Sequence, residues 1–92
     1  MKVLHVIDSA GLYGAEVMLL GLMAEQRRQG MEPLLASIGT AEAGVKPLER
    51  EAHRLGVTVV PFRMQAGPNL PGACRILGYA RRAGVDVIHS HG

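Results

Sequence analysis

The sequence predicts an α/β domain built on a parallel sheet. Short runs of β-branched and aliphatic residues alternate along the chain with longer stretches of helical periodicity, which is the pattern of strand–helix–strand units. The three longer stretches also end alike, in "RRQGMEP", "HRLGVTV" and "RRAGVDV". Arginines suit the negative end of a helix dipole, and a glycine suits the left-handed residue that follows a helix. Each of these segments therefore indicates a helix-to-strand junction.

Four strands and three helices follow from this pattern. The strands are expected at Val3–Ile7, Pro33–Ile38, Val57–Val60 and Val85–His89. The helices are expected at Ala15–Gln29, Pro47–Leu55 and Pro71–Ala83. The first helix is apolar nearly all round before it becomes polar in "EQRRQ", so its first half is expected to be buried. The helix at Pro71–Ala83 gathers its apolar residues on one face, as a helix that packs on a sheet does.

The order βαβαβαβ predicts a four-stranded parallel sheet with right-handed crossovers and the strand order 3-2-1-4. This is half of a Rossmann-like doubly wound sheet. The chain has 92 residues, which is enough for one domain, and it stops directly after the fourth strand. We therefore expect residues 1–92 to form a single, partial Rossmann-like domain.

Composition excludes several classes of protein. The formal net charge is only +2 and three residues are aromatic, so nucleic acid is not an expected partner. The one cysteine, Cys74, cannot form an internal disulfide, which fits a reducing compartment. The start "MKVLHVID" is not a signal peptide, and no apolar stretch approaches the length of a membrane span. We expect a cytoplasmic domain; its basic helix ends leave open a peripheral contact with the inner membrane face.

Unusual residues follow the first and fourth predicted strands, where such sheets bind ligands. The first strand leads into "DSAGLYGAE", and the fourth leads into "HSHG". Gly11 and Gly14 permit positive φ angles and close approach of a ligand to the backbone, and the next helix offers unpaired N–H groups to an anion. The alternative is a tight strand-to-helix corner in which Glu16 merely favours the helix dipole. A G-x-G-x-x-G fingerprint and a G-K-[ST] loop are both absent.

Histidines mark the fourth strand end. His89 and His91 alternate along the strand, so both side chains should point to one face, about 6.6 Å apart. With Asp8 they could ligate a metal, but the sequence shows no further ligand cluster, and a ligand-contacting or general-base role is the stronger hypothesis. His5 is expected to be a satisfied core histidine, and His53 lies among charged residues on a solvated helix face.

Together, "MKVLHVIDSAGLYGAEVMLL" and "GVDVIHSHG" resemble the opening of a family 4 glycosyltransferase of the GT-B fold, and the resemblance covers essentially the whole chain. It implies half of a GT-B N-terminal domain, the acceptor-side domain of a retaining transferase that uses a nucleotide-sugar donor and needs no metal or other cofactor. The acceptor would be a sugar, a lipid or a polysaccharide precursor. The C-terminal domain with its paired-glutamate donor motif is missing, so the isolated chain is expected to be inactive.

The resemblance also implies roles for individual residues. Gly11, Gly14 and Ala15 would approach the donor diphosphate, and Glu16 would support the loop and the helix start. The resemblance implies that the catalytic residue near the transferred sugar is His91 or, as second choice, His89. Tyr13 departs from the family pattern, which often has glycine there.

Two other functions remain open at this point. The same loop suits a small phosphate- or nucleotide-binding module without chemistry. The chain also suits a structural half-Rossmann piece that associates with itself, as a homodimer through the exposed edge of the fourth strand.

Overall fold

A computed structural model describes residues 1–91; Gly92, the last residue of "HSHG", lies outside the described part. The elements are β1 (Lys2–Ile7), α1 (Gly14–Arg28), β2 (Glu32–Gly39), a 3₁₀ turn η1 (Ala41–Ala43), α2 (Pro47–Arg54), β3 (Thr58–Arg63), α3 (Leu70–Ala83) and β4 (Val87–His91). The strands are parallel and ordered β3-β2-β1-β4. The predicted fold class and strand order are thus confirmed.

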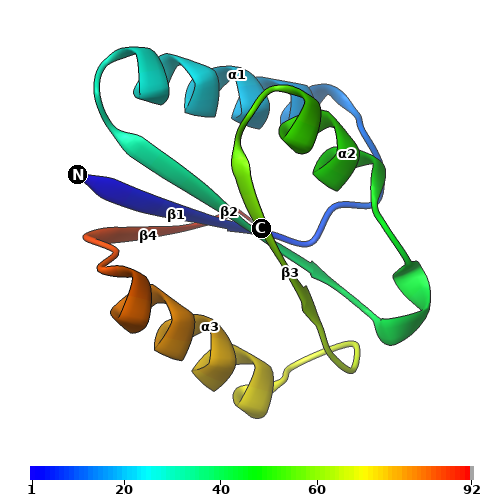
Figure 1. Cartoon of the computed structure of the whole chain (residues 1–92). Helices are drawn as coiled ribbons and strands as arrows, with labels where there is room; N and C mark the ends of the chain where they lie inside the picture. The colour runs from blue at the N-terminus through cyan, green and yellow to red at the C-terminus, as the bar shows by residue number, and fades with distance from the viewer. Residues whose placement is uncertain (92) are drawn as a thin grey trace.

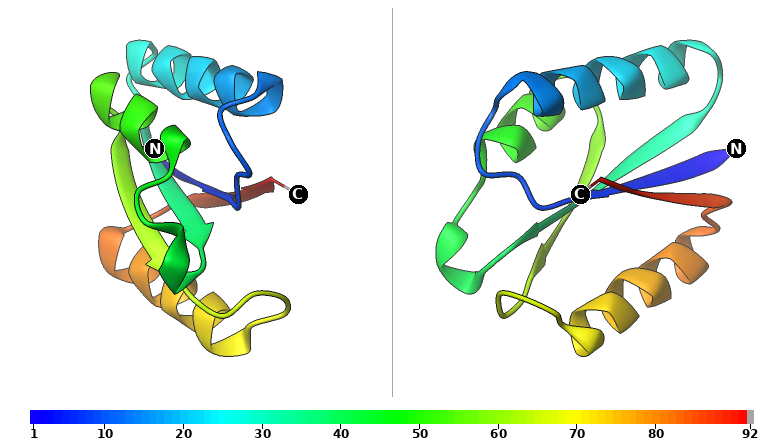
Figure 2. Two further views of the ribbon diagram at one scale, coloured as in Figure 1. Left: turned by 90° about the vertical axis from the view of Figure 1, so that its right-hand side faces the viewer. Right: turned by 180° about the vertical axis from the view of Figure 1, so that it is seen from behind.

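The molecule has three layers. Helices α1 and α2 cover one face of the sheet and α3 covers the other (Figures 1 and 2). Because β2 follows β1 but β4 returns to pair with the opposite side of β1, the chain direction across the sheet reverses there. This reversal is the topological switch point, where open α/β sheets bind ligands.

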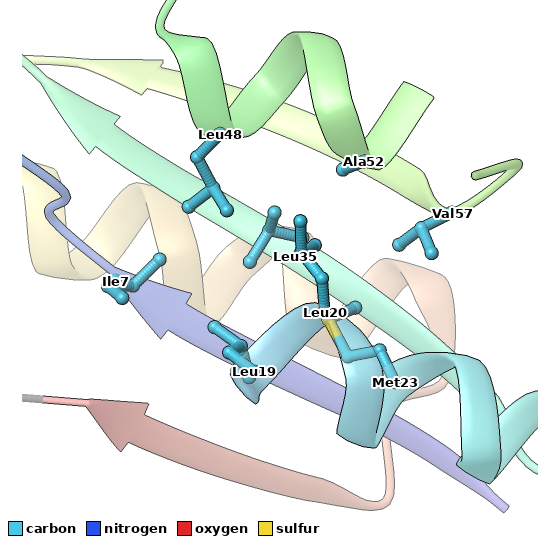
Figure 3. Close-up of a cluster of buried hydrophobic side chains, with 8 residues drawn as sticks. All are labelled: Ile7, Leu19, Leu20, Met23, Leu35, Leu48, Ala52 and Val57. Carbon is cyan, nitrogen blue, oxygen red and sulfur yellow. The ribbon is translucent and has the colours of Figure 1, made fainter. Parts of the chain in front are cut away.

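Each face of the sheet has its own hydrophobic core. Figure 3 shows the core beneath α1 and α2, in which Leu35 of the central strand β2 contacts both helices' side chains. The members of this core are Ile7, Leu19, Leu20, Met23, Leu35, Leu48, Ala52 and Val57. The opposite core packs α3 through Ile76 and Ala80 onto Leu4 and Phe62. Alternate residues of β1 therefore serve opposite cores, as the two-residue period of a strand requires.

The helix ends follow the sequence prediction. Gly30, Gly56 and Gly84 have φ angles of 86°, 75° and 73°, the left-handed conformation that glycine adopts without strain. At the start of α3 the Asn69 side chain accepts a hydrogen bond of 2.7 Å from the Gly72 N–H, which caps the helix.

Two strands, β3 and β4, differ from the prediction by more than one residue. β3 continues through Pro61 to Arg63, because β3 is an edge strand bonded to β2 alone and has no ladder on its other side that proline would break. β4 covers Val87–His91 rather than the predicted Val85–His89. The Val85 N–H still donates to the Ala80 carbonyl of α3, and the Asp86 N–H donates to Lys2, so these residues form the turn before the strand.

The prediction that the first half of α1 is buried is wrong for one of its sides. Val17 is 55% exposed and Met18 is 76% exposed. The edge strand β4 also carries two exposed apolar residues on opposite faces of the sheet, Val87 and Ile88. Within residues 1–91, no element covers these side chains.

Truncating the central core residue should destabilise the domain strongly. We expect Leu35→Ala to lower the free energy of unfolding by about 2–5 kcal/mol, because Leu35 is fully buried and its loss leaves a cavity. The control Leu77→Ala removes a side chain that is 57% exposed and should change stability by roughly 0.5 kcal/mol or less. Urea denaturation followed by circular dichroism measures both, and equal effects would contradict this account of the core.

Candidate functional site

The carboxyl ends of β1 and β4 lie side by side. In the parallel register His5 is opposite His89, and Ile7 is opposite His91. An open hollow of about 410 Å³ occupies this edge, and it is lined by Ile7, Asp8, Ala15, Glu16, Ser90 and His91. The structure therefore brings the start of α1 and the tip of β4 to one place.

The first turn of α1 presents unpaired backbone donors toward this hollow. The first intrahelical hydrogen bond joins the Val17 N–H to the Tyr13 carbonyl at 2.9 Å, so the N–H groups of Gly14, Ala15 and Glu16 precede the ladder. The Glu16 carboxylate accepts a 2.9 Å hydrogen bond from the Tyr13 N–H. The Glu16 carboxylate thus points back to the start of the helix. This hydrogen bond stabilises the turn in which the N–H groups of Gly14, Ala15 and Glu16 are exposed.

The two loop glycines have different surroundings, and neither has a positive φ angle. Gly11 is buried, and a Cβ atom there would lie 2.8 Å from the Tyr13 ring. The close neighbour of Gly11 is therefore an aromatic side chain of the chain itself. Gly14 is exposed, and a Cβ atom there would meet nothing within 4 Å, which leaves its backbone accessible to a ligand.

Three histidines converge beside the hollow. His5 Nδ1 lies 3.0 Å from His91 Nε2, and the ring of His91 stacks on that of His89 with centroids 4.2 Å apart. His5 is fully buried and hydrogen-bonded, as the sequence predicts for a core histidine. Its partner His91 was not predicted, although the strand order 3-2-1-4 already makes the first and fourth strands neighbours.

Burial keeps two of these imidazoles neutral. Burial lowers the pKa of His5, the hydrogen bond with Gln26 raises it in part, and His89 lowers it again. The pKa of His91 is lowered by burial and then by its neighbours His89 and His5. Since the ordinary value is already only 6.5, both rings are mainly neutral at pH 7, and each then has one protonated nitrogen and one nitrogen with a lone pair.

The buried side chain of Lys46 stabilises the edge of the sheet at the carboxyl ends of β1 and β2. Lys46 Nζ donates to Asp8 Oδ1 at 2.8 Å and to the Ser9 carbonyl at 2.9 Å, and it also donates to the Ile38 carbonyl. A Cβ atom on Gly39 would lie 2.8 Å from Lys46 Cε, so a larger residue there would force the lysine side chain to shift. Lys46 joins the loop after β1 to the end of β2. No local motif indicates the contact between Lys46 and Asp8, because these two residues are far apart in the sequence.

An ion pair between Arg63 and Glu49 holds the next strand end. Arg63 Nη2 lies 2.8 Å from both carboxylate oxygens of Glu49, and the Glu49 side chain also accepts from the Lys46 N–H at 3.0 Å. Burial alone would raise the pKa of Glu49, but the Ser37 hydroxyl, the Lys46 N–H and Arg63 together hold this pKa below its ordinary value. The pair therefore favours the charged carboxylate.

A second cavity, of about 390 Å³, lies at the same sheet edge on the α3 side. Its wall includes Val6 and Ile38 from the sheet, Asp8 from the loop after β1, and Asn69 and Ile76 from α3 and its cap. Asp8 borders both cavities, so it stands at the boundary between the two faces of the switch point.

Comparison with known proteins shows the fold. No protein-family model and no curated protein matches the chain. Among solved structures, the chain is similar to MurG from Acinetobacter baumannii, a GT-B glycosyltransferase, with a TM-score of 0.67 and 14% sequence identity. The match covers 99% of this chain and 28% of that chain. At this identity the likeness supports a GT-B-like, Rossmann-type fold. None of the helices formed by residues 1–91 has the length and apolar character needed to cross a bilayer.

The Glu49 ion pair predicts loss of stability in acid. A carboxyl whose pKa is lower in the folded chain than its ordinary value of 4.5 stabilises the fold above that pH. This contribution disappears as the pH falls through the folded-state pKa. We expect Glu49→Gln to flatten the pH dependence of the unfolding free energy between about pH 5 and pH 3. Urea denaturation at several pH values measures it, with the exposed Glu42→Gln as control. An unchanged slope in Glu49→Gln would refute the role of this pair.

Proposed function

We propose that this chain is the N-terminal part of the first domain of a GT-B glycosyltransferase. The complete enzyme would transfer a sugar, with retention, from a nucleotide-sugar donor to an acceptor. The observation that carries the proposal is the hollow in which the first turn of α1 meets the tips of β1 and β4. The likeness of the whole chain to a GT-B structure supports it.

The start of α1 suits the donor diphosphate. The N–H groups of Gly14, Ala15 and Glu16 are unpaired within the helix, and the positive end of the helix dipole favours an anion there. Donors that are already in position stabilise the negative charge that develops on a leaving diphosphate. Gly11 would contribute by shaping the loop, because its backbone is packed beneath Tyr13.

The tip of β4 suits the transferred sugar. His91 lines the hollow that also contains Ala15, so a sugar attached to a diphosphate at α1 would lie against this imidazole. His89 stacks on His91 and would hold its ring in place. The cavity on the α3 side suits the acceptor, because Asp8 borders both cavities. By the family resemblance this acceptor would be a sugar, a lipid or a polysaccharide precursor.

A second domain is part of this proposal. The hollow is open, whereas glycosyl transfer needs a cleft that excludes water and holds the nucleotide. The C-terminal domain of the proposed enzyme would close over this edge, and the 92 residues alone would be inactive. We place the enzyme in the cytoplasm, with a peripheral contact to the inner membrane face where the acceptor is a lipid.

The reading frame beyond Gly92 offers the direct test of this domain organisation. We expect it to continue into the rest of the first domain and a second Rossmann-like domain with a paired-glutamate motif. A stop codon after Gly92 would overturn the transferase proposal. In that case the unpaired donors of α1 would favour a small phosphate-binding module, which titration of the chain with UDP would detect.

Gly14 is the sharpest position for testing the diphosphate contact. In the two-domain protein we expect Gly14→Val to lower kcat/KM for the nucleotide sugar by about 100-fold or more, because its side chain would occupy the space of the diphosphate. The matched control is Gly21→Val in the same helix, since a Cβ atom at either position meets nothing within 4 Å. Both variants should fold normally by circular dichroism. Full turnover by Gly14→Val would show that the diphosphate does not bind at the start of α1.

A further inference from the structure

We infer that His5, His89 and His91 form a binding site for a divalent transition-metal cation of the zinc type. The inference goes beyond the proposed transferase, for which no metal is expected. It rests on the cluster as the structure places it, with one histidine from the buried strand β1 and two from the edge strand β4. The sequence offered the β4 pair together with Asp8. In the structure Asp8 pairs with Lys46, and the cross-strand register supplies His5 as the third ligand instead.

The spacing of the three rings suits one cation. Each histidine offers a ring nitrogen, and these nitrogens all lie within 4.8 Å of one another. In a tetrahedral site with Zn–N bonds of 2.0–2.1 Å, ligand nitrogens are about 3.3 Å apart. The separation of 3.0 Å between His5 Nδ1 and His91 Nε2 is already close to this value. His89 is exposed on the edge strand and already lies beside the other two, with its ring centroid 4.2 Å from that of His91 and 5.6 Å from that of His5.

A neighbouring amide prepares the buried ligand. His5 Nε2 lies 3.0 Å from Gln26 Oε1 of α1. An amide oxygen only accepts, so Nε2 carries the proton and Nδ1 presents its lone pair toward His91. Metal-bound histidines characteristically donate their second N–H to such an acceptor, which fixes the tautomer and the ring orientation. Imidazole is a preferred ligand of Zn²⁺, Cu²⁺ and Ni²⁺.

The burial of the three residues provides both rigidity and access. His5 is fully buried, His91 is partly buried and His89 is exposed, so the cluster opens to solvent at the β4 edge. Three protein ligands leave one tetrahedral position for water. Because His91 also lines the hollow, a bound cation would occupy the imidazole that the proposed function assigns to the sugar.

Titration of the 92-residue chain with Zn²⁺ alone tests the inference. Isothermal calorimetry should show one cation per chain, and binding should shift the NMR resonances of His5, His89 and His91. We expect His89→Asn and His91→Asn each to weaken binding at least tenfold. Gln26→Leu should also weaken it about tenfold, as loss of the acceptor behind a ligand does. Gln26→Leu keeps all three histidines, so its effect also separates a three-ligand site from binding by the β4 pair alone.

His53→Asn is the matched control, because His53 is an exposed histidine of α2 outside the cluster. It should bind Zn²⁺ as the unchanged chain does. Absence of binding would overturn the inference, and so would equal affinity in His91→Asn or unchanged affinity in Gln26→Leu. The zinc titration does not depend on sugar transfer, so a chain that binds Zn²⁺ while its two-domain form transfers no sugar would refute only the proposed function.

Discussion

The crossover through α3 brings β4 back to pair with β1, and the geometry of the site depends on this pairing. Had β4 added to β3, two strands, β3 and β2, would separate its tip from the end of β1, which leads into α1. The observed parallel register instead sets Ile7 opposite His91 and His5 opposite His89. One pairing therefore creates both the hollow at the sheet edge and the histidine cluster beside it, because parallel strands deliver their carboxyl ends to a common edge.

Two charged contacts keep this edge in shape. A buried ammonium group is unfavourable unless polar partners surround it, and Lys46 meets that requirement with Asp8 and two carbonyl groups. The ion pair between Arg63 and Glu49 joins the carboxyl end of β3 to the first turn of α2. These contacts use side chains to connect three successive strand ends, so the backbone donors at the start of α1 remain available to a ligand.

The sequence predicted the features that depend on local periodicity and backbone conformation. The strand–helix alternation and the three glycines that end the helices indicated the fold class, the strand order and most boundaries to within one residue. Features that depend on partners distant in the sequence were missed or wrong. Pro61 is accommodated because β3 is an edge strand, Val17 and Met18 are exposed because nothing in residues 1–91 packs on that side, and the contact of His5 with His91 requires the register of β1 and β4.

The electrostatics of the edge indicate which group would bind an anion. The pKa values of His5 and His91 are lowered, so these rings bring no positive charge at pH 7. The Lys46 ammonium is engaged by Asp8 and lies behind the edge with a side chain only 11% exposed. The remaining favourable field comes from the N–H groups and the dipole of α1. A diphosphate would thus be held by backbone at the first turn, while the neutral imidazoles face either a sugar hydroxyl or a cation. The same three histidines cannot serve both at once, because coordination would use the lone pair that a sugar hydroxyl needs as its acceptor.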